Sequence, residues 1–241
     1  MLKHIPNAIT SANLFFGCLS IVATFDGNPT LAATYIVIAA ILDFFDGFAA
    51  RILKVSGELG KQLDSLADVV SFGVAPGFIF YIHSQENLQF SSDFLQFVPL
   101  LVLISYLPFS LMIFSAIRLA KFNIDTRQTD SFIGLPTPAN ALFICAIPFV
   151  MADGPIWAEN IFNSIAFLSL YPIVFSYLLI AELPLFALKF KHFGVKGNEV
   201  RYLFLTLCLL LISLFTYVGI ALCILLYLTL SLFLKIKNKS A

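Results

Sequence analysis

Long apolar runs recur along almost the whole chain of 241 residues, and they constrain its fold more than any other feature. A membrane-spanning helix needs about 20 mostly apolar residues, because the hydrocarbon core of a bilayer is about 30 Å thick. The runs predict an all-α fold, a polytopic bundle of eight transmembrane helices in a single integral membrane domain, 1–241. The expected spans are 6–25, 31–51, 62–83, 97–119, 138–152, 161–181, 201–217 and 219–235.

The overall composition supports a membrane protein and excludes other classes. Hydrophobic residues make up 60% of the chain and charged residues only 12%, whereas a soluble domain has about 25% charged residues. A soluble domain of this size could not bury so much apolar surface. The 14 basic and 14 acidic side chains balance, so no basic patch is available for a polyanion and no nucleic-acid partner is expected.

The positions of Lys and Arg predict the orientation. All 14 lie at the chain ends or at the loops that follow the second, fourth and sixth apolar runs, and the intervening loops have none. Because cytoplasmic loops are enriched in Lys and Arg, both termini are expected in the cytoplasm of a multi-pass protein of the cell membrane. Residues 182–200 mix apolar and basic side chains, which predicts a cytoplasmic interfacial segment. Residues 201–235 are expected to form a C-terminal helix hairpin.

Four aspartates interrupt the second and third apolar runs near their expected cytoplasmic ends. Asp43 and Asp46 are three residues apart, and Asp64 and Asp68 are four apart, so each pair shares one face of a helix. The turn between the two runs is short, which makes the helices antiparallel neighbours and lets all four carboxylates converge. Acids inside a membrane are rare and generally functional, so a simple capping role does not explain four of them.

Converging carboxylates repel one another unless cations lie between them. Oxygen ligands suit hard divalent ions, and four carboxylates can hold two such ions. We therefore expect two Mg²⁺ or Mn²⁺ ions, with Ca²⁺ as a further option. Small residues and cations beside the aspartates offer close backbone approach, a helix start and positive charge for a phosphate. These neighbours are Gly47, Ala50, Arg51, Gly57, Gly60 and Lys61.

Residues 43–68 contain a spaced pattern of fixed residues. The pattern runs Asp43-Phe-Phe-Asp46-Gly47-Phe-Ala-Ala50-Arg51, then eight residues, Gly60, three residues, Asp64, three residues and Asp68. It resembles the signature of the CDP-alcohol phosphotransferases, with every fixed position present. The resemblance implies an enzyme that moves a substituted phosphate from a CDP-linked donor to an alcohol and releases CMP. It also suggests a homodimer.

The resemblance further implies roles for individual residues. Asp43, Asp46, Asp64 and Asp68 would bind the metals, and Asp68 would also be the catalytic general base for the acceptor hydroxyl. The cytidine diphosphate would lie along Gly47, Ala50, Arg51, Gly57 and Gly60. Lys61 is added to this CDP-binding set, because it opens the third apolar run, where a helix start and a cation can hold phosphate.

Other segments are similar to the membrane-integral phosphatidylserine synthases, namely 5–17, 64–76, 118–123 and 132–139. This similarity implies CDP-diacylglycerol as the donor, L-serine as the acceptor and membrane lipid around the site. Lys121 departs from that pattern, where Arg is more frequent. Serine is a zwitterion, so its carboxylate needs a cation, for which Arg118 is the first candidate. The other serine-binding candidates are Lys121, Asn123, Asn13 and Ser71.

Two alternatives stay open. A phosphorylated acceptor, such as glycerol 3-phosphate or inositol phosphate, would need more positive charge, and Arg118, Lys121 and Arg127 are available for it. A cation transporter would use the acids as an ion path. The transporter is the weaker alternative, because the acids are confined to one half of two spans and the other half is apolar.

Overall fold

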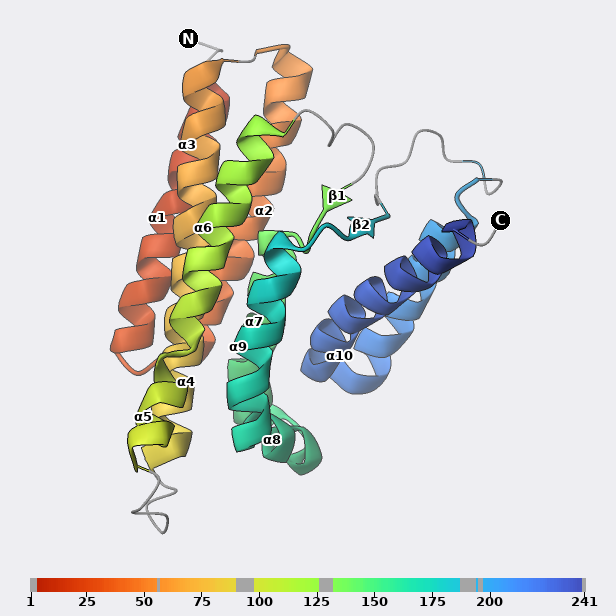
Figure 1. Cartoon of the computed structure of the whole chain (residues 1–241). Coiled ribbons are helices and arrows are strands. Elements are labelled where there is room, and N and C mark those ends of the chain that lie inside the picture. The colour runs from red at the N-terminus through yellow and green to blue at the C-terminus, as the bar shows by residue number, and fades with distance from the viewer. Residues whose placement is uncertain are drawn as a thin grey trace.

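A computed structural model of the chain describes residues 4–55, 57–89, 98–125, 132–186, 194 and 197–239 (Figure 1). Helices account for nearly all of the described residues, as the apolar runs predicted. In chain order the elements are α1 (Ile5–Phe25), α2 (Pro29–Leu53), α3 (Glu58–Asp68), the π-helix η2 (Val69–Val74), α4 (Ala75–Gln89), α5 (Val98–Tyr106), α6 (Pro108–Ile124), β1 (Phe132–Ile133), α7 (Thr137–Asp153), α8 (Ile156–Phe162), α9 (Ile165–Ile180), β2 (Pro184–Leu185) and α10 (Glu199–Lys239).

Several helices are long and apolar enough to cross a membrane. Within the described residues four qualify by length and composition, namely Ile5–Phe25, Glu58–Leu88, Leu100–Ile124 and Glu199–Leu234. A fifth is added if α8 and α9, which are bent by 63°, count as one broken span. The chain is therefore a multi-pass membrane protein. Of the remaining expected spans, α7 is a shorter apolar helix, and α2 is a helix of 25 residues that contains two of the aspartates.

The face that α1 buries is polar and small rather than apolar. Its buried residues include Thr10, Asn13, Gly17 and Ser20, while large apolar side chains such as Phe15 point outward. Soluble helices show the reverse arrangement, but in a membrane small residues let helices approach closely and apolar residues face the lipid. A Cβ atom at Gly17 would clash with Ser71 of η2, so this glycine permits the contact between α1 and η2.

The third apolar run is one continuous helical segment with a change of winding in its middle. α3 ends at Asp68, η2 follows directly, and α4 continues to Gln89. η2 contacts α1, α6 and α7 as well as its own neighbours. Short π-helical segments are frequent near functional sites, and this one begins at the residue after Asp68.

The C-terminal part packs on one side of the bundle. α10 contacts α7 and β2, and its backbone breaks at Thr216, where φ is 48° and ψ is −116°. The Cys223 thiol lies 3.7 Å from the Cys208 carbonyl oxygen, so the chain folds back and the two parts of α10 lie side by side (Figure 1).

The all-α prediction is confirmed, and the described residues add one short strand pair. β1 and β2 form an antiparallel pair of two residues each, which joins the start of α7 to the end of α9. Both segments lie outside the helices, so their backbone groups need other hydrogen-bond partners. The pairing supplies them, and next to it Gly134 N donates to Leu183 O at 3.0 Å. The predicted interfacial segment 182–200 lies partly outside the described residues, and its described part contains β2 and the start of α10.

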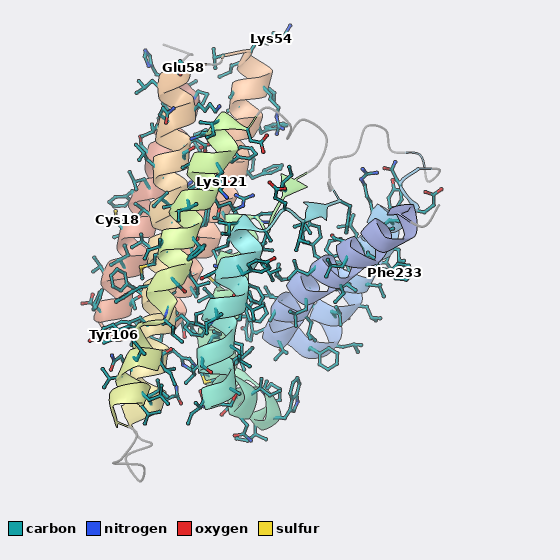
Figure 2. All side chains as sticks on the ribbon, viewed as in Figure 1. Cys18, Lys54, Glu58, Tyr106, Lys121 and Phe233 are labelled. Atoms are coloured by element: carbon teal, nitrogen blue, oxygen red, sulfur yellow. The ribbon has the colours of Figure 1, made fainter. Side chains whose placement is uncertain are left out.

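The two ends of the bundle can be told apart. The N-terminus and the α2–α3 turn lie at one end, and α8 lies toward the other (Figure 1). Lys54 and Glu58 of the α2–α3 turn lie at the first end, and Tyr106 lies far from them (Figure 2). The aspartates lie in the half of the bundle next to the α2–α3 turn.

Candidate active site and metal centre

Three of the four predicted aspartates meet between α2 and α3. Asp43, Asp64 and Asp68 each offer one carboxylate oxygen, and these oxygens all lie within 4.8 Å of one another. One carboxylate oxygen of the cluster, Oδ1 of Asp68, is buried and has no hydrogen-bond partner among the described residues. Three converging carboxylates with an unpartnered buried oxygen fit the oxygen ligand set of a divalent cation.

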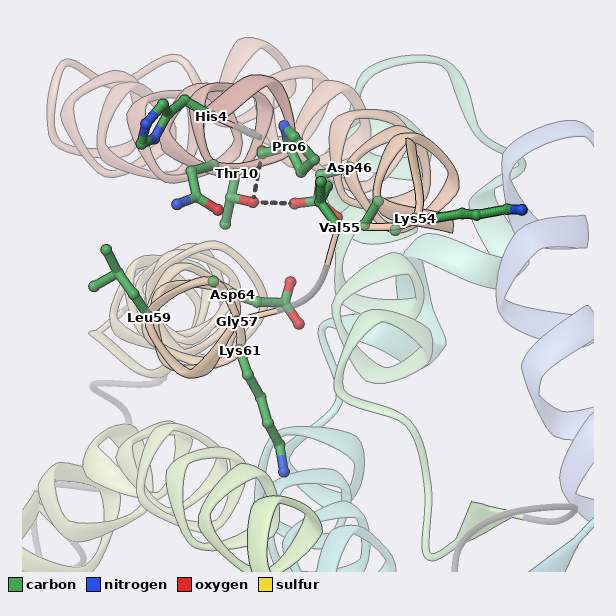
Figure 3. A pocket seen from close by; sticks show the side chains of 14 residues that line it. His4, Pro6, Thr10, Asp46, Lys54, Val55, Gly57, Leu59, Lys61 and Asp64 are labelled. Carbon is green, nitrogen blue, oxygen red and sulfur yellow. Dashed lines mark hydrogen bonds between the residues drawn. The ribbon is translucent and has the colours of Figure 1, made fainter. Parts of the chain in front are cut away.

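Asp46 lies beside this group but is bound by another residue. Its Oδ2 atom accepts a hydrogen bond of 2.5 Å from the Thr10 hydroxyl of α1, which also lies 3.0 Å from the Pro6 carbonyl oxygen (Figure 3). Thr10 and Asp46 are only 4% and 6% exposed. The structure thus groups three of the four predicted ligands, and Asp46 lies beside them with one carboxylate oxygen bonded to α1.

Thr10 was not among the predicted site residues. The available signal was the polar spacing of Asn7, Thr10 and Asn13, which lie three residues apart and so share one face of α1. That spacing predicts a polar helix face, but it does not identify the partner. The partner depends on how α1 packs against α2, and α1 and α2 contact each other along their length.

A polar cavity of about 680 Å³ lies beside the aspartates, between α1, α2 and α3. The Asp64 carboxylate and the Thr10–Asp46 pair face this space (Figure 3). Five of the six predicted CDP-binding residues line it: Gly47, Ala50, Gly57, Gly60 and Lys61. The sixth, Arg51, is exposed on the last turn of α2 and is not part of the lining.

The α2–α3 turn brings small residues to the cavity wall. α2 ends at Leu53, and the next residue, its C-cap Lys54, adopts a left-handed conformation with φ of 51°. Gly57 is the N-cap of α3. A Cβ atom at Gly60 would lie 3.1 Å from Oδ1 of Asn7, so a larger residue there would push against α1. The free N–H groups at the start of α3 therefore lie next to a cavity that contains room for an anion.

Lys61 and Asn123 tie α3 to α6. The Lys61 ammonium donates to the Asn123 carbonyl oxygen at 2.8 Å, and the Asn123 amide donates to Ser65 Oγ at 2.8 Å. Asn123, predicted as a serine-binding candidate, thus acts in this conformation as a link between two helices. Lys61 lines the cavity with its side chain while its ammonium lies at α6.

Arg118 is buried on α6, where only 7% of it is exposed. It lines a small cavity of about 50 Å³ together with Lys121, and its Nε atom has no hydrogen-bond partner among the described residues. Arg118 interacts electrostatically with Asp68 and with Tyr227. A buried guanidinium with a free donor, close to an aspartate of the cluster, is suited to bind a carboxylate or a phosphate.

The last two serine-binding candidates lie in the interior. The Ser71 hydroxyl donates to the Asn13 carbonyl oxygen at 3.1 Å, and both residues are fully buried. The side-chain amide of Asn13 has no partner among the described residues. Neither residue lines the cavity at the aspartates or the one at Arg118, so the five candidates do not form one pocket. Arg127 lies outside the described residues.

Comparison with known proteins gives one family. The model of the CDP-alcohol phosphatidyltransferase family matches residues 3–175. A relative from Helicobacter pylori (strain J99) is 39% identical over 141 residues, 58% of this chain and 54% of that protein. A relative from Bacillus subtilis (strain 168) is 32% identical over 198 residues, 82% of this chain and 96% of that protein. A relative from Methanocaldococcus jannaschii is 35% identical over 140 residues, 58% of each chain.

All three relatives are named CDP-diacylglycerol–serine O-phosphatidyltransferase. The match spans about half the length of the H. pylori relative and nearly all of the B. subtilis one. The family match includes all four aspartates, the polar cavity and Arg118, and it ends before α10 begins.

Proposed function

Because the chain belongs to the CDP-alcohol phosphatidyltransferase family, we propose that it transfers a phosphatidyl group from CDP-diacylglycerol to L-serine. The serine hydroxyl oxygen forms the new bond to the donor phosphorus, the bond from that phosphorus to CMP breaks, and the products are phosphatidylserine and CMP. The observation that carries the proposal is the cluster of Asp43, Asp64 and Asp68 beside a polar cavity of about 680 Å³, in a chain whose relatives are named for this reaction.

The polar cavity takes the cytidine diphosphate of the donor. Gly47, Ala50, Gly57 and Gly60 let the nucleotide approach the backbone, and the start of α3 presents N–H groups to a phosphate. Arg51 and Lys61 add positive charge nearby, since both side chains are long enough to move toward a bound diphosphate. The acyl chains remain in the membrane lipid around the bundle.

The aspartates bind divalent cations, two Mg²⁺ or Mn²⁺ ions in our proposal, with Ca²⁺ as a further option. The donor set supports this, because it is all carboxylate and one oxygen of Asp68 is buried without a partner. Such ions stabilise negative charge on the transferred phosphate. Asp43, Asp64 and Asp68 supply the clustered ligands, and Thr10 holds Asp46 in the position from which it joins them.

Asp68 is also the general base, which accepts the proton of the serine hydroxyl as the new bond forms. Arg118, which interacts with Asp68 and has a free donor, binds the serine carboxylate. Lys121 lines the same small cavity and adds a second positive charge for the serine carboxylate. Asn123, Asn13 and Ser71 are retained as weaker serine-binding candidates, since each lies within one of the elements that border the aspartates or Arg118.

The reaction takes place at the cytoplasmic side, with both termini in the cytoplasm and eight crossings of the membrane. The positions of Lys and Arg support this orientation. The eight crossings require α7 to span as a short helix, α8 and α9 to form one broken span and α10 to cross twice. A homodimer was expected from the family resemblance, but nothing in the described residues of this single chain supports it, and it is not part of the proposal.

An assay of CMP release tests the proposal. Purified protein is incubated with CDP-diacylglycerol and Mg²⁺ or Mn²⁺, and serine, glycerol 3-phosphate, inositol or inositol phosphate is added singly. Release that depends on serine supports the complete proposal. Release with a phosphorylated acceptor instead of serine would agree with the proposed role of the aspartates. It would contradict serine as the acceptor and Arg118 as the residue that binds the serine carboxylate. No release from folded, metal-loaded protein with any acceptor contradicts the proposed reaction.

A further inference from the structure

A second cavity, of about 500 Å³, lies between α7, α8, α9 and the part of α10 after Thr216. Apolar and aromatic side chains line it, including Trp157, Phe167, Leu170 and Leu222. It is separate from the polar cavity, with which it shares no residue. Its lower wall is α8, which lies toward the end of the bundle opposite to the α2–α3 turn (Figure 1).

The two hydroxyl groups in the lining, those of Tyr171 and Ser164, are already hydrogen-bonded within the protein. The Tyr171 hydroxyl donates to Asn140 at 2.9 Å. The Ser164 hydroxyl donates to the Ile161 carbonyl oxygen at 2.7 Å and accepts from Phe167 N at 3.2 Å. A ligand that needs hydrogen bonds or charge compensation would therefore lose them on entry. The lining selects hydrocarbon.

Closely packed aromatic rings form one wall of the cavity. Phe143 and Tyr171 have ring centroids 4.8 Å apart, and Tyr171 and Phe175 are 4.0 Å apart. Phe162 and Phe167 pack at 5.0 Å across the bend of 63° between α8 and α9. A wall in which each ring supports the next does not collapse into the space, so the cavity is preformed.

The depth of the cavity matches one leaflet of a bilayer. Ala166 and Phe175 both line it and are nine residues apart on α9, which corresponds to about 14 Å at 1.5 Å per residue. Half of a hydrocarbon core of about 30 Å is about 15 Å. Trp157 lies at the α8 end, and Trp is a residue that favours the membrane–water interface.

The cavity opens toward the outer surface of the bundle. Its rim includes Leu170, Val174 and Leu225, which are 58%, 47% and 40% exposed. In a multi-pass membrane protein this surface faces lipid, so the molecules that reach the opening are acyl chains. A lipid whose headgroup lies at the aspartates belongs to the other leaflet, and its chains end near the midplane of the bilayer.

We propose that this cavity binds one acyl chain of a membrane phospholipid from the leaflet opposite to the aspartates. The site is distinct from the donor site, and the inference depends on the membrane location of the chain and not on the proposed reaction. A bound chain would fill the space between α9 and the second part of α10 and so fasten the C-terminal hairpin to the bundle.

The single Trp of the sequence, Trp157, lines the cavity and reports on it directly. Full-length protein is stripped of lipid in detergent and titrated with phosphatidylcholine in which one acyl chain is dibrominated, because bromine quenches Trp fluorescence on contact. We expect saturable quenching at about one probe per chain, and one retained lipid per chain in native mass spectrometry.

Two variants that block the cavity test whether the quenching arises there. Ala166→Phe places a ring in the space, and Val174→Phe narrows the opening, which gives a second variant if the first folds poorly. Each should raise the half-saturating probe concentration about tenfold or more, since losing even a few methylene contacts in a hydrophobic pocket has this effect. Ala152→Phe is the matched control, because Ala152 is exposed near the same end and does not line the cavity.

Three results would overturn the proposal. Quenching that rises linearly with probe and is equal in the blocked variants would show contact with bulk lipid only. Absence of quenching, together with a dimer mass in native mass spectrometry, would show that a second copy of the chain covers the cavity. Loss of the bound lipid in Asp43→Asn would show that it belongs to the aspartate site. Failure of the acceptor assay leaves this experiment unaffected, so the two proposals fail separately.

Discussion

The two large cavities differ in the residues that line them and in their position in the fold, although their volumes of about 680 and 500 Å³ are similar. The polar one lies between α1, α2 and α3 and has carboxylates, glycines and helix N–H groups in its walls. The aromatic one lies between α7, α8, α9 and α10, and its few hydroxyls are bonded within the protein. One is suited to charged ligands and the other to hydrocarbon.

The difference shows how a membrane protein can keep its proposed reaction site apart from a site that binds a lipid chain. The residues of the polar cavity lie within the family match of 3–175, whereas one wall of the aromatic cavity comes from α10, which begins at Glu199. We thus assign the reaction to the part of the chain that the family shares. We assign acyl-chain binding to the contact between that part and the C-terminal hairpin. Four predictions test the proposed chemistry, of which the first also tests its separation from the aromatic cavity, and the largest expected effect comes first.

Removal of divalent cations should abolish the reaction and leave the aromatic cavity unchanged. The carboxylates of Asp43, Asp64 and Asp68 repel one another and cannot stabilise a phosphate without cations. CMP release should fall to background in excess chelator and return with Mg²⁺ or Mn²⁺. Full activity in the chelator would contradict the metal centre. A parallel loss of Trp157 quenching by the brominated lipid would contradict the separation of the two sites.

Asp68→Asn should reduce turnover by about 10²–10⁴-fold, the usual contribution of a general base. The amide keeps the size of the side chain, so folding and binding of CDP-diacylglycerol should change little. Steady-state CMP release gives kcat, and thermal unfolding checks the fold. Asp153→Asn is the control, since Asp153 is an exposed aspartate at the end of α7. Unchanged turnover in Asp68→Asn would reject Asp68 as the base.

Arg118→Ala should raise the KM for serine about 10- to 100-fold and the KM for CDP-diacylglycerol much less. A hydrogen bond to a charged group contributes about 1.5–3 kcal/mol, which corresponds to this range. Arg118→Lys keeps the charge and should lose less, because it gives up only the two-pronged contact. Kinetics with each substrate varied in turn make the comparison. Equal changes in both KM values would remove Arg118 from the serine pocket.

Thr10→Val should raise the half-saturating Mg²⁺ concentration about tenfold, because groups that orient metal ligands commonly have effects of this size. The hydroxyl that holds Asp46 is lost, while the shape is preserved. Thr10→Ser keeps the hydroxyl and should restore the wild-type value. Thr34→Val is a matched control, since the Thr34 hydroxyl donates to the Thr30 carbonyl oxygen within α2, away from the aspartates. An unchanged Mg²⁺ dependence in Thr10→Val would contradict the positioning role.

The sequence made the polar cavity predictable and left the aromatic one hidden. A carboxylate inside an apolar run is costly, so Asp43 and Asp64 stand out by themselves. Helix periodicity then predicts which of them share a face, and a short turn predicts that the two faces meet. Phe143 or Tyr171 in an apolar run carries no such signal, because aromatic residues serve equally as core, as lipid-facing surface or as the wall of a cavity.

Other features depended on tertiary packing and could not be predicted from spacing. The contact of Thr10 with Asp46 depends on the relative rotation of α1 and α2. The link from Lys61 to the Asn123 carbonyl depends on how α6 lies against α3. The break between α8 and α9 follows from Ser164, which caps the new helix, although the stretch 161–181 has the composition of one continuous span. Periodicity predicts helices and their faces, but not which partner each face meets.

Metal binding tests the central claim, that the aspartates form a divalent cation centre, most directly. Purified protein is titrated with Mn²⁺, and the free ion is measured by electron paramagnetic resonance with and without CMP. We predict saturable binding of two ions per chain, tighter with CMP present, and loss of that binding in Asp43→Asn and Asp64→Asn but not in Asp153→Asn. Absence of stoichiometric Mn²⁺ binding by folded protein, or equal binding by all three variants, would contradict the account.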